Sequence, residues 1–324
     1  MSIKEIQSYA IQAVRKLAHK LGRVPLVSEF NIELPRFNMN VFGSYDSLLK
    51  AAGLHTEEEI VPKKPQPRPP RILVFDIETK PLKVWAWGTF DQNIGLDMII
   101  EDQSILSFAA KFIGNDHIFY QDLSQNTDYT KDEALVTAMF ELLNQADIII
   151  GQNSDQFDIK KLNAKFEEYA LGQPTPYKSI DTLKIMRKHL GLTSKKLSFA
   201  TDKYNKKYKK LKHEKFPGMS LWLECLKGNQ SAWECLKEYN IWDCLATEEL
   251  YLDHLRKWDK SINYGVFTSV SNCCPNCGSE SLKELEFNYS KIGIFQNYQC
   301  IECHTISSSK HNELSQAQKK NLLK

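Results

Sequence analysis

The stretch RILVFDIETKP, residues 71–81, combines the pattern of a buried strand with two acidic residues. Its apolar run, ILVF at 72–75, is aliphatic and aromatic, which is typical of a strand covered on both faces. Asp76 and Glu78 follow, one residue apart. Because strand side chains alternate between two faces, both carboxylates project from the same face. Two like charges held side by side at the end of a buried strand repel each other unless a cation is present.

The length and composition are ordinary for a globular protein. A chain of 324 residues has room for roughly two domains of about 150 residues each and an accessory module. No run approaches the ~18 consecutive apolar residues of a transmembrane helix, so we expect no membrane partner. The first ten residues, MSIKEIQSYA, lack the apolar core of a secretory signal, so we expect a cytoplasmic protein. A net charge of +2 indicates no particular partner, because the distribution of charge matters more than its sum.

A proline-rich segment divides the chain. The sequence VPKKPQPRPP at 61–70 has five prolines in ten residues, which predicts an extended, semi-rigid spacer. Before it, apolar spacing and a closing Gly53 predict helices at 4–20 and 44–54. We therefore expect a helical module at 1–58, a linker at 59–70 and a larger domain at 71–260.

Strand and helix patterns follow one another in the larger domain. We expect strands at 71–78, 104–113, 117–121 and 146–151, and helices at 131–144, 157–170, 181–190, 219–227 and 231–256. Strands that come first in a meander and then alternate with helices predict an α/β fold with a mixed central sheet flanked by helices. The pattern then changes to short strands with paired cysteines at 270–306, before a polar tail at 307–324.

Two further acids follow later elements of this domain. Asp158 lies in the first turn of the helix after the strand ADIIIGQN, where the helix dipole also favours an anion. Asp243 lies four residues after Tyr239 in EYNIWDCLATEELY, so the two share a helix face. Four converging carboxylates would raise one another's pKa unless cations were present. Carboxylates suit Mg²⁺ or Mn²⁺, and two such ions roughly 3.5 to 4 Å apart can activate water in phosphodiester cleavage.

Three motifs together resemble those of the DEDD 3′-to-5′ exonuclease superfamily. They are FDIET at 75–79, GQNSDQFDIKKL at 151–162 and YNIWD at 239–243. The tyrosine four residues before the last acid resembles the third motif of the DEDDy branch. The histidine branch would have His where Glu238 stands. The surrounding sequence, from YKSIDTLKI to WLECLKGNQSAWECLKEYNIWDCLATEEL, is similar to the YprB-type and family B polymerase-type exonuclease domains.

The resemblance covers about residues 71–256 and implies a ribonuclease H-like fold. It also implies a metal-dependent 3′-to-5′ exonuclease that hydrolyses terminal phosphodiesters, with DNA favoured over RNA. The family's two Mg²⁺ or Mn²⁺ ions would be held by Asp76, Glu78, Asp158 and Asp243. The hydroxyl of Tyr239 would orient the attacking water, because a tyrosine with an ordinary pKa near 10 is a poor base at neutral pH.

Two polar residues near these motifs have two interpretations each. Asp181 could supply another carboxylate to the site, although its place before the helix TLKIMRKHL also makes it a suitable N-cap. Asn153 could contact nucleic acid or cap a turn.

The segment KKLSFATDKYNKKYKKLKHEK, residues 195–215, is strongly basic. It has nine lysines against two acids, with aromatic residues between them. Lysines suit a phosphate backbone, and aromatic rings can stack with bases. We expect contacts with nucleic acid from Lys206, Lys207, Lys209 and Lys210. The alternative is a solvated charged loop.

Two CxxC pairs predict a zinc ribbon near the C-terminus. Twenty-two residues separate CPNC at 274–277 from CIEC at 300–303, a spacing typical of tetrahedral zinc sites. The expected ligands of one structural Zn²⁺ are Cys274, Cys277, Cys300 and Cys303. Cys273 and His304 flank the pairs and are alternative ligands. The cysteines at 225, 235 and 244 stand singly, which indicates small core residues.

The N-terminal module resembles the homing-endonuclease-associated repeat. The resemblance rests on AVRKLAHKLGRVPLVSEF at 13–30 and FGSYDSLLKAAGL at 42–54, and it implies a DNA-binding unit that accompanies a nuclease. Seven basic against four acidic residues in positions 1–54 fit DNA contact. A small helical docking module is the alternative. For the whole chain, two alternatives to an exonuclease stay open: a non-catalytic nucleic-acid-binding or recruitment protein, and an endonuclease or RNA-processing nuclease that uses the same metal site.

Overall fold

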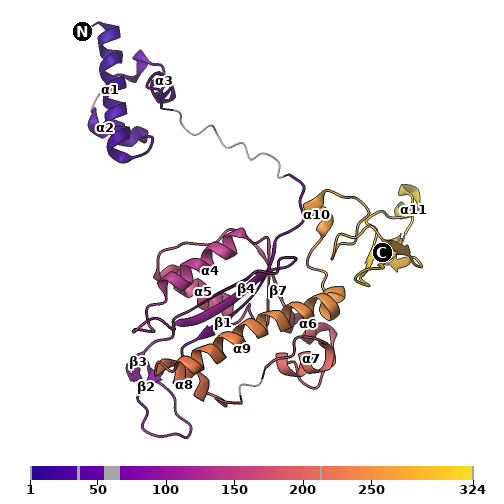
Figure 1. The fold of residues 1–324 in the computed structure, drawn as a ribbon. Helices are drawn as coiled ribbons and strands as arrows, with labels where there is room; N and C mark the ends of the chain where they lie inside the picture. The colour runs from indigo at the N-terminus through magenta and orange to yellow at the C-terminus, as the bar shows by residue number, and fades with distance from the viewer. Residues whose placement is uncertain (1, 35–36, 55–65, 212–213, 323–324) are drawn as a thin grey trace. The chain divides into compact units, whose positions relative to one another are not determined.

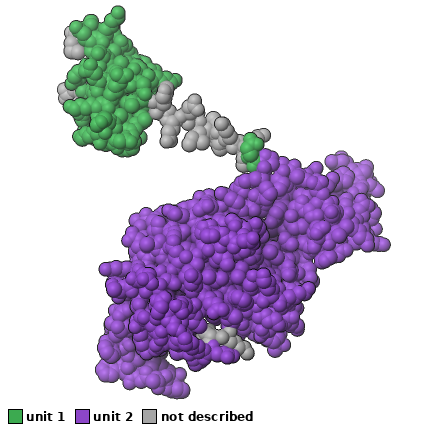
Figure 2. Space-filling model, viewed as in Figure 1, with its two compact units in different colours: residues 1–66 green, residues 67–324 purple. Residues whose placement is uncertain are grey.

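The computed structural model describes residues 2–34, 37–54, 66–211 and 214–322. The chain divides into two compact units, residues 1–66 and 67–324 (Figure 2). Most of the expected linker at 59–70 lies outside the described residues. No helix in the described ranges is both long enough and apolar enough to cross a membrane.

The first unit is helical, as expected. It consists of α1 (Ile3–Leu21), α2 (Val27–Glu33), the 3₁₀ turn η1 (Met39–Val41) and α3 (Tyr45–Ala51). Ser2 caps α1, and Gly22 ends it in the left-handed conformation with φ 67°. The apolar stripe of α1 packs against α2 and α3 through Val14, Phe30 and Leu48, which are fully buried. The short helix α2 is not indicated by the apolar spacing.

The second unit is built on a five-stranded mixed sheet (Figure 1). Its strands are β1 (Ile72–Thr79), β4 (Ile105–Phe112), β5 (Ile118–Asp122), β6 (Ile148–Gly151) and β7 (Lys178–Asp181). In the order β5-β4-β1-β6-β7, the central strand β1 is antiparallel to β4 and parallel to β6. The mixed sheet is confirmed. The edge strand β7 is not predicted from the sequence, because it is only four residues long and lies in a short stretch between Pro176 and the helix that follows Asp181.

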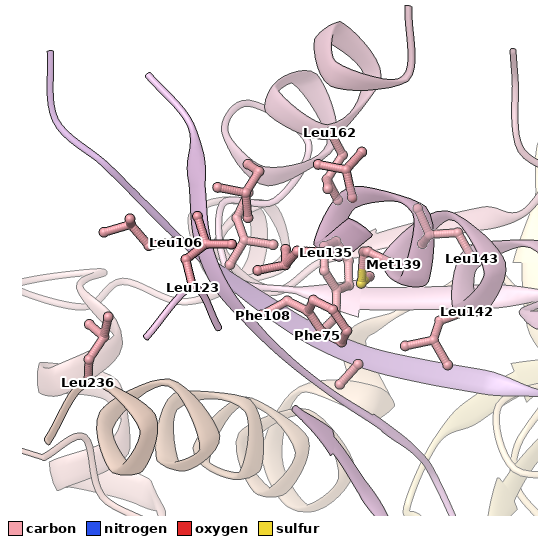
Figure 3. Packing of buried hydrophobic residues seen from close by; sticks show 14 of the residues in the cluster. Phe75, Leu106, Phe108, Leu123, Leu135, Met139, Leu142, Leu143, Leu162 and Leu236 are labelled. Carbon is pink, nitrogen blue, oxygen red and sulfur yellow. The ribbon is translucent and has the colours of Figure 1, made fainter. Parts of the chain in front are cut away.

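Helices cover both faces of this sheet. They are α4 (Glu133–Gln145), α5 (Asp158–Glu168), α6 (Thr182–His189), α7 (Leu197–Tyr204), α8 (Ser220–Leu226) and α9 (Gln230–Glu249), which continues through the π-helix η3 (Leu250–Leu255) and the 3₁₀ turn η4 (Arg256–Trp258). Phe75 of β1 belongs to the core that includes α4 and α5, with Met139 and Leu162 (Figure 3). Val74 points to the opposite core. This alternation explains why the whole run at 72–75 is apolar.

The remaining residues form two smaller structures. Between β1 and β4, the chain makes β2 (Lys83–Val84), η2 (Leu96–Met98) and β3 (Ile99–Glu101), and the loop joining β2 to β3 projects from the unit (Figure 1). The C-terminal part contains α10 (Tyr264–Thr268), β8 (Leu282–Glu284), β9 (Asn288–Ser290), β10 (Gly293–Phe295), β11 (Asn297–Cys300), β12 (Ile306–Ser308) and α11 (Gln316–Lys320). β11 lies between β8 and β12, whereas β9 and β10 form a separate hairpin.

Candidate active site and metal centres

Three acids meet where β1 and α9 cross. Asp76 and Glu78 project from one face of β1, and α9 packs on this strand with Asp243 on its inner side. One carboxylate oxygen from each acid lies within 4.8 Å of the others. Asp158, at the start of α5, lies beside these three, because its Oδ1 accepts a hydrogen bond of 3.2 Å from the backbone N–H of Ile77. The structure therefore brings the four predicted acids to one region, three of them in the tightest group.

The turn before α5 determines where Asp158 lies. Asn153 adopts φ 60°, and its carbonyl accepts hydrogen bonds from the N–H groups of Gln156 and Phe157. A Cβ at Gly151, the last residue of β6, would stand 2.5 Å from the Cβ of Ser154, so the chain can turn this closely only at a glycine. Asn153 thus takes part in the turn, and its contact with nucleic acid stays a prediction.

Asp181 is the N-cap of α6, which is one of its two predicted roles. Its Oδ1 accepts hydrogen bonds of 2.9 Å from the N–H of Leu183 in the first turn of α6 and from the N–H of Asn153. Burial raises the pKa of this carboxyl. Like Asp158, it lies outside the three-acid group, and its hydrogen bonds join α6 to the turn before α5.

Burial and mutual repulsion perturb the acids strongly. Burial raises the pKa of Asp76 well above its ordinary value, and the carboxylates of Asp158, Asp243 and Glu78 raise it further. Burial, followed by the charge of Asp243, raises the pKa of Glu78 to about 8. Burial also raises the pKa of Asp158 to about 7. Such a cluster retains protons at neutral pH unless cations replace them, and hard oxygen ligands suit Mg²⁺ or Mn²⁺.

A lysine of the basic segment reaches into this cluster. The ammonium of Lys210 forms an ion pair with the Asp243 carboxylate and lies 4.5 Å from the ring centroid of Tyr239. Burial alone would lower the pKa of Lys210, but Asp243 and Tyr239 raise it above its ordinary value. Burial and Asp243 raise the pKa of Tyr239 to about 12, so its hydroxyl keeps its proton at neutral pH.

The other lysines of the predicted nucleic-acid set do not enter the cluster. The backbone N–H groups of Lys206 and Lys207 donate to the Glu249 carboxylate of α9, which fixes the segment after α7. The ammonium of Lys209 lies 3.5 Å from the carbonyl of Asp202. Because α7 occupies residues 197–204, the segment is not one continuous loop.

Two contacts of the acids are not predicted from the sequence. The indole N–H of Trp222 in α8 donates a hydrogen bond of 3.0 Å to Oε2 of Glu78. The amide of Asn240, fully buried in α9, donates 2.7 Å to Oδ2 of Asp76 and accepts from the hydroxyl of Ser107. A polar residue directly after Tyr239 on a buried helix is the one signal that could have indicated Asn240.

The four cysteines of the CxxC pairs form a second cluster. The sulfurs of Cys274, Cys277, Cys300 and Cys303 lie within 4.8 Å of one another. Four thiols at this spacing fit the tetrahedral donor set of Zn²⁺. Burial raises the pKa of Cys277 to about 11. Burial also acts to raise the pKa of Cys303, but hydrogen bonds with Thr305 act in the opposite direction and the pKa of Cys303 is lowered to about 7. Cys273 and His304 lie outside this group. The three single cysteines lie in α8 and α9, with Cys225 and Cys244 buried.

The sequence matches the models of two known families. The sequence model of the RNase_H superfamily matches residues 73–255. The chain belongs to the RNase H superfamily. Its RNase H domain contains all four acids, Tyr239 and Lys210, and this membership supports a nuclease role. The model of the homing endonuclease associated repeat matches residues 7–55, which supports association with nucleic acid.

Two further comparisons complete this picture. No curated protein matches the chain. Among solved structures, the chain is similar to the family B DNA polymerase from the hyperthermophilic archaeon Pyrobaculum calidifontis, with 15% identity and a TM-score of 0.44. The similarity covers 70% of this chain and 32% of that polymerase, so it adds nothing on activity.

Proposed function

We propose that this RNase H superfamily protein is a DEDDy-type 3′-to-5′ exonuclease that hydrolyses terminal phosphodiesters of nucleic acid, with DNA preferred. The observation that carries the proposal is the convergence of Asp76, Glu78 and Asp243 within 4.8 Å, beside Asp158, in a domain of this superfamily. Their pKa values lie above the ordinary range, which disfavours the ionised cluster without cations. Structural acids on a surface would not need such an arrangement.

In this proposal the four acids would hold two Mg²⁺ or Mn²⁺ ions. Bound there, the ions would lower the pKa of a water molecule and stabilise the leaving oxygen. Tyr239, protonated because its pKa is about 12, would donate or accept a hydrogen bond that orients the attacking water. Asn240 and Trp222 would hold Asp76 and Glu78 in place through their hydrogen bonds. Lys210 would supply part of the positive charge beside Asp243.

The other parts of the chain would bind and deliver the substrate. We assign residues 1–58 to DNA binding, 59–70 to a linker, 71–260 to the exonuclease domain, 270–306 to a zinc ribbon with one structural Zn²⁺, and 307–324 to a polar tail. Lys206, Lys207 and Lys209 would contact phosphates on the approach to the acids. A tethered DNA-binding unit raises the local concentration of substrate, which is the advantage of linked modules.

Degradation of 5′-labelled single- and double-stranded DNA and RNA tests the proposal. With Mn²⁺, the wild type should shorten strands from the 3′ end, and Asp158→Asn should lose roughly 1,000-fold or more of the rate. Asp155→Asn is the matched control, because Asp155 lies in the same motif but pairs with Lys184. Equal activity of wild type and Asp158→Asn would exclude this site. Cleavage of a circular single strand would favour an endonuclease that uses the same metal site. Binding of nucleic acid without any hydrolysis would favour a non-catalytic recruitment protein.

A further inference from the structure

The loop between β2 and β3 has large aromatic side chains that are exposed to an unusual extent. In this aromatic loop, residues 85–98, the exposed fractions are 75% for Trp85, 99% for Trp87 and 82% for Phe90. Figure 1 shows the loop projecting from the small β2–β3 sheet. Tryptophan is rarely so exposed in a folded protein, and a grouped set of exposed large apolar residues generally marks a binding surface.

The aromatic loop rises from an anchored base. The ammonium groups of Lys80 and Lys83 each lie 2.7 Å from the Glu101 carboxylate, and Lys80 is almost fully buried. The backbone N–H of Trp85 donates 2.9 Å to the carbonyl of Met98, which closes the loop. The aromatic residues are therefore presented from a fixed hairpin.

The base of the loop adjoins the acid cluster. Glu78 and Lys80 are two residues apart at the end of β1, so the chain passes from the acids directly into the hairpin. A groove of about 550 Å³ lies at this base, and Leu82, Lys83 and Leu223 of α8 are among the residues that line it. The residue before Leu223 is Trp222, whose indole binds Glu78. The acids and this groove are thus joined through neighbouring residues of β1 and α8, and the groove lies at the base of the aromatic loop.

The few charges of the loop favour bases over phosphates as its ligand. Between residues 81 and 100 the only charged side chains are Lys83, Asp91 and Asp97, so the loop carries no positive excess for phosphates. Aromatic rings stack with the faces of unpaired bases and need no charge or particular sequence to do so. The lysines that line the groove share it with Glu101 and Asp128. Lys83 is paired with Glu101, and Lys227 with Glu224, so the groove also offers little net positive charge to a phosphate.

We propose that the aromatic loop is a stacking platform for unpaired bases of the strand whose 3′ end lies at the acid cluster. Trp87 and Phe90 would hold bases a few nucleotides from the scissile bond, so the enzyme would act on single-stranded or frayed 3′ ends in preference to blunt duplex. Paired bases would be excluded because their faces are already stacked within the helix. This inference rests on the proposed exonuclease function.

Binding of a fluorescein-labelled oligothymidylate tests the platform, with Ca²⁺ in place of Mn²⁺ to limit hydrolysis. The double variant Trp87→Ala/Phe90→Ala should bind roughly tenfold or more weakly by anisotropy. The slope of affinity against salt should not change, because no phosphate contact is lost. Leu96→Ala is the matched control: Leu96 is 87% exposed in the same loop but is aliphatic and cannot stack. Unchanged binding by the double variant would overturn the proposal and leave a protein partner as the occupant.

A minimal substrate separates the platform from the catalytic proposal. The p-nitrophenyl ester of thymidine 5′-monophosphate is too short to reach the loop, so the double variant should hydrolyse it at the wild-type rate. Its KM for the oligonucleotide should rise roughly tenfold. Equal losses on both substrates would overturn the platform, since the variant would then disturb the acids. If the wild type hydrolyses neither substrate, the exonuclease proposal fails, whereas the binding measurement still decides on the platform.

Discussion

Trp222 and Glu78 are 144 residues apart in sequence, and the indole N–H of the first donates a hydrogen bond of 3.0 Å to Oε2 of the second. The indole also lies edge-on to the ring of Tyr239, with centroids 6.2 Å apart. One side chain of α8 therefore contacts both an acid of β1 and the tyrosine of α9. Burial and Asp243 raise the pKa of Glu78 to about 8, and this hydrogen bond acts in the opposite direction.

Trp222→Phe should weaken metal binding while preserving the aromatic packing. Without the N–H group, the pKa of Glu78 rises further and its carboxylate loses orientation, so the affinity for Mn²⁺ should fall by about tenfold. Isothermal titration with Mn²⁺ at constant pH measures this directly. Trp258→Phe is the control, because Trp258 stacks on His189 and takes no part in the cluster. Equal affinities for the wild type and Trp222→Phe would contradict the role assigned to this hydrogen bond.

The stability of the metal-free protein should decrease as pH rises. The pKa of Glu78 is about 8 in the folded chain and about 4.5 when unfolded, so between these values the folded state holds more protons. The free energy of unfolding therefore falls across this window and levels off above it. We expect a Tm about 2–4 °C lower at pH 8.5 than at pH 6, and a larger stabilisation by Mn²⁺ at the higher pH.

Glu78→Gln provides the control for this pH dependence. The amide does not titrate, so its melting curves should depend less on pH, and Mn²⁺ should stabilise the variant less. A wild-type Tm that rises steadily from pH 6 to pH 8.5 without metal would contradict the assigned pKa shift.

Lys210→Met should increase the stabilisation that Mn²⁺ provides. In the metal-free protein the ammonium of Lys210 neutralises part of the charge on Asp243, and a bound divalent ion would do the same. Removing the lysine leaves more charge for the metal to neutralise, so the rise in Tm on adding Mn²⁺ should exceed that of the wild type by about 2 °C or more. Lys209→Met is the matched control: the Lys209 ammonium lies 3.5 Å from the carbonyl of Asp202 in α7, so this variant should behave like the wild type.

Cys300→Ser should abolish zinc binding, whereas Cys273→Ser should not. Cys300 lies 3.6 Å from Cys277, sulfur to sulfur, within the four-cysteine cluster, and Cys273 lies outside it. A tetrahedral site with one thiolate missing loses most of its affinity for Zn²⁺. Metal analysis of the purified variants should give about one zinc per chain for Cys273→Ser and near none for Cys300→Ser. Zinc loss from both variants would show that Cys273 is also a ligand.

Much of the fold was accessible from local patterns. The apolar run at 72–75, the helix at 3–21 and the mixed arrangement of strands and helices all depend on side-chain periodicity within a single element. The short strand β7 and the helices α2 and α7 were missed, because each is only four to eight residues long and has little periodic signal. Tertiary pairing with β6 and packing on the core decide these elements.

The sequence alone determined which residue types carry the chemistry: the acids of three motifs and the thiols of two CxxC pairs are recognisable because their spacing follows from strand, helix and knuckle geometry. The tertiary structure alone decided which side chains support them. Asn240 reaches Asp76 across 164 residues, and Lys210 reaches Asp243 from a separate segment. Such contacts depend on how α9 and the basic segment lie against the sheet, and periodicity within one element contains no information about that.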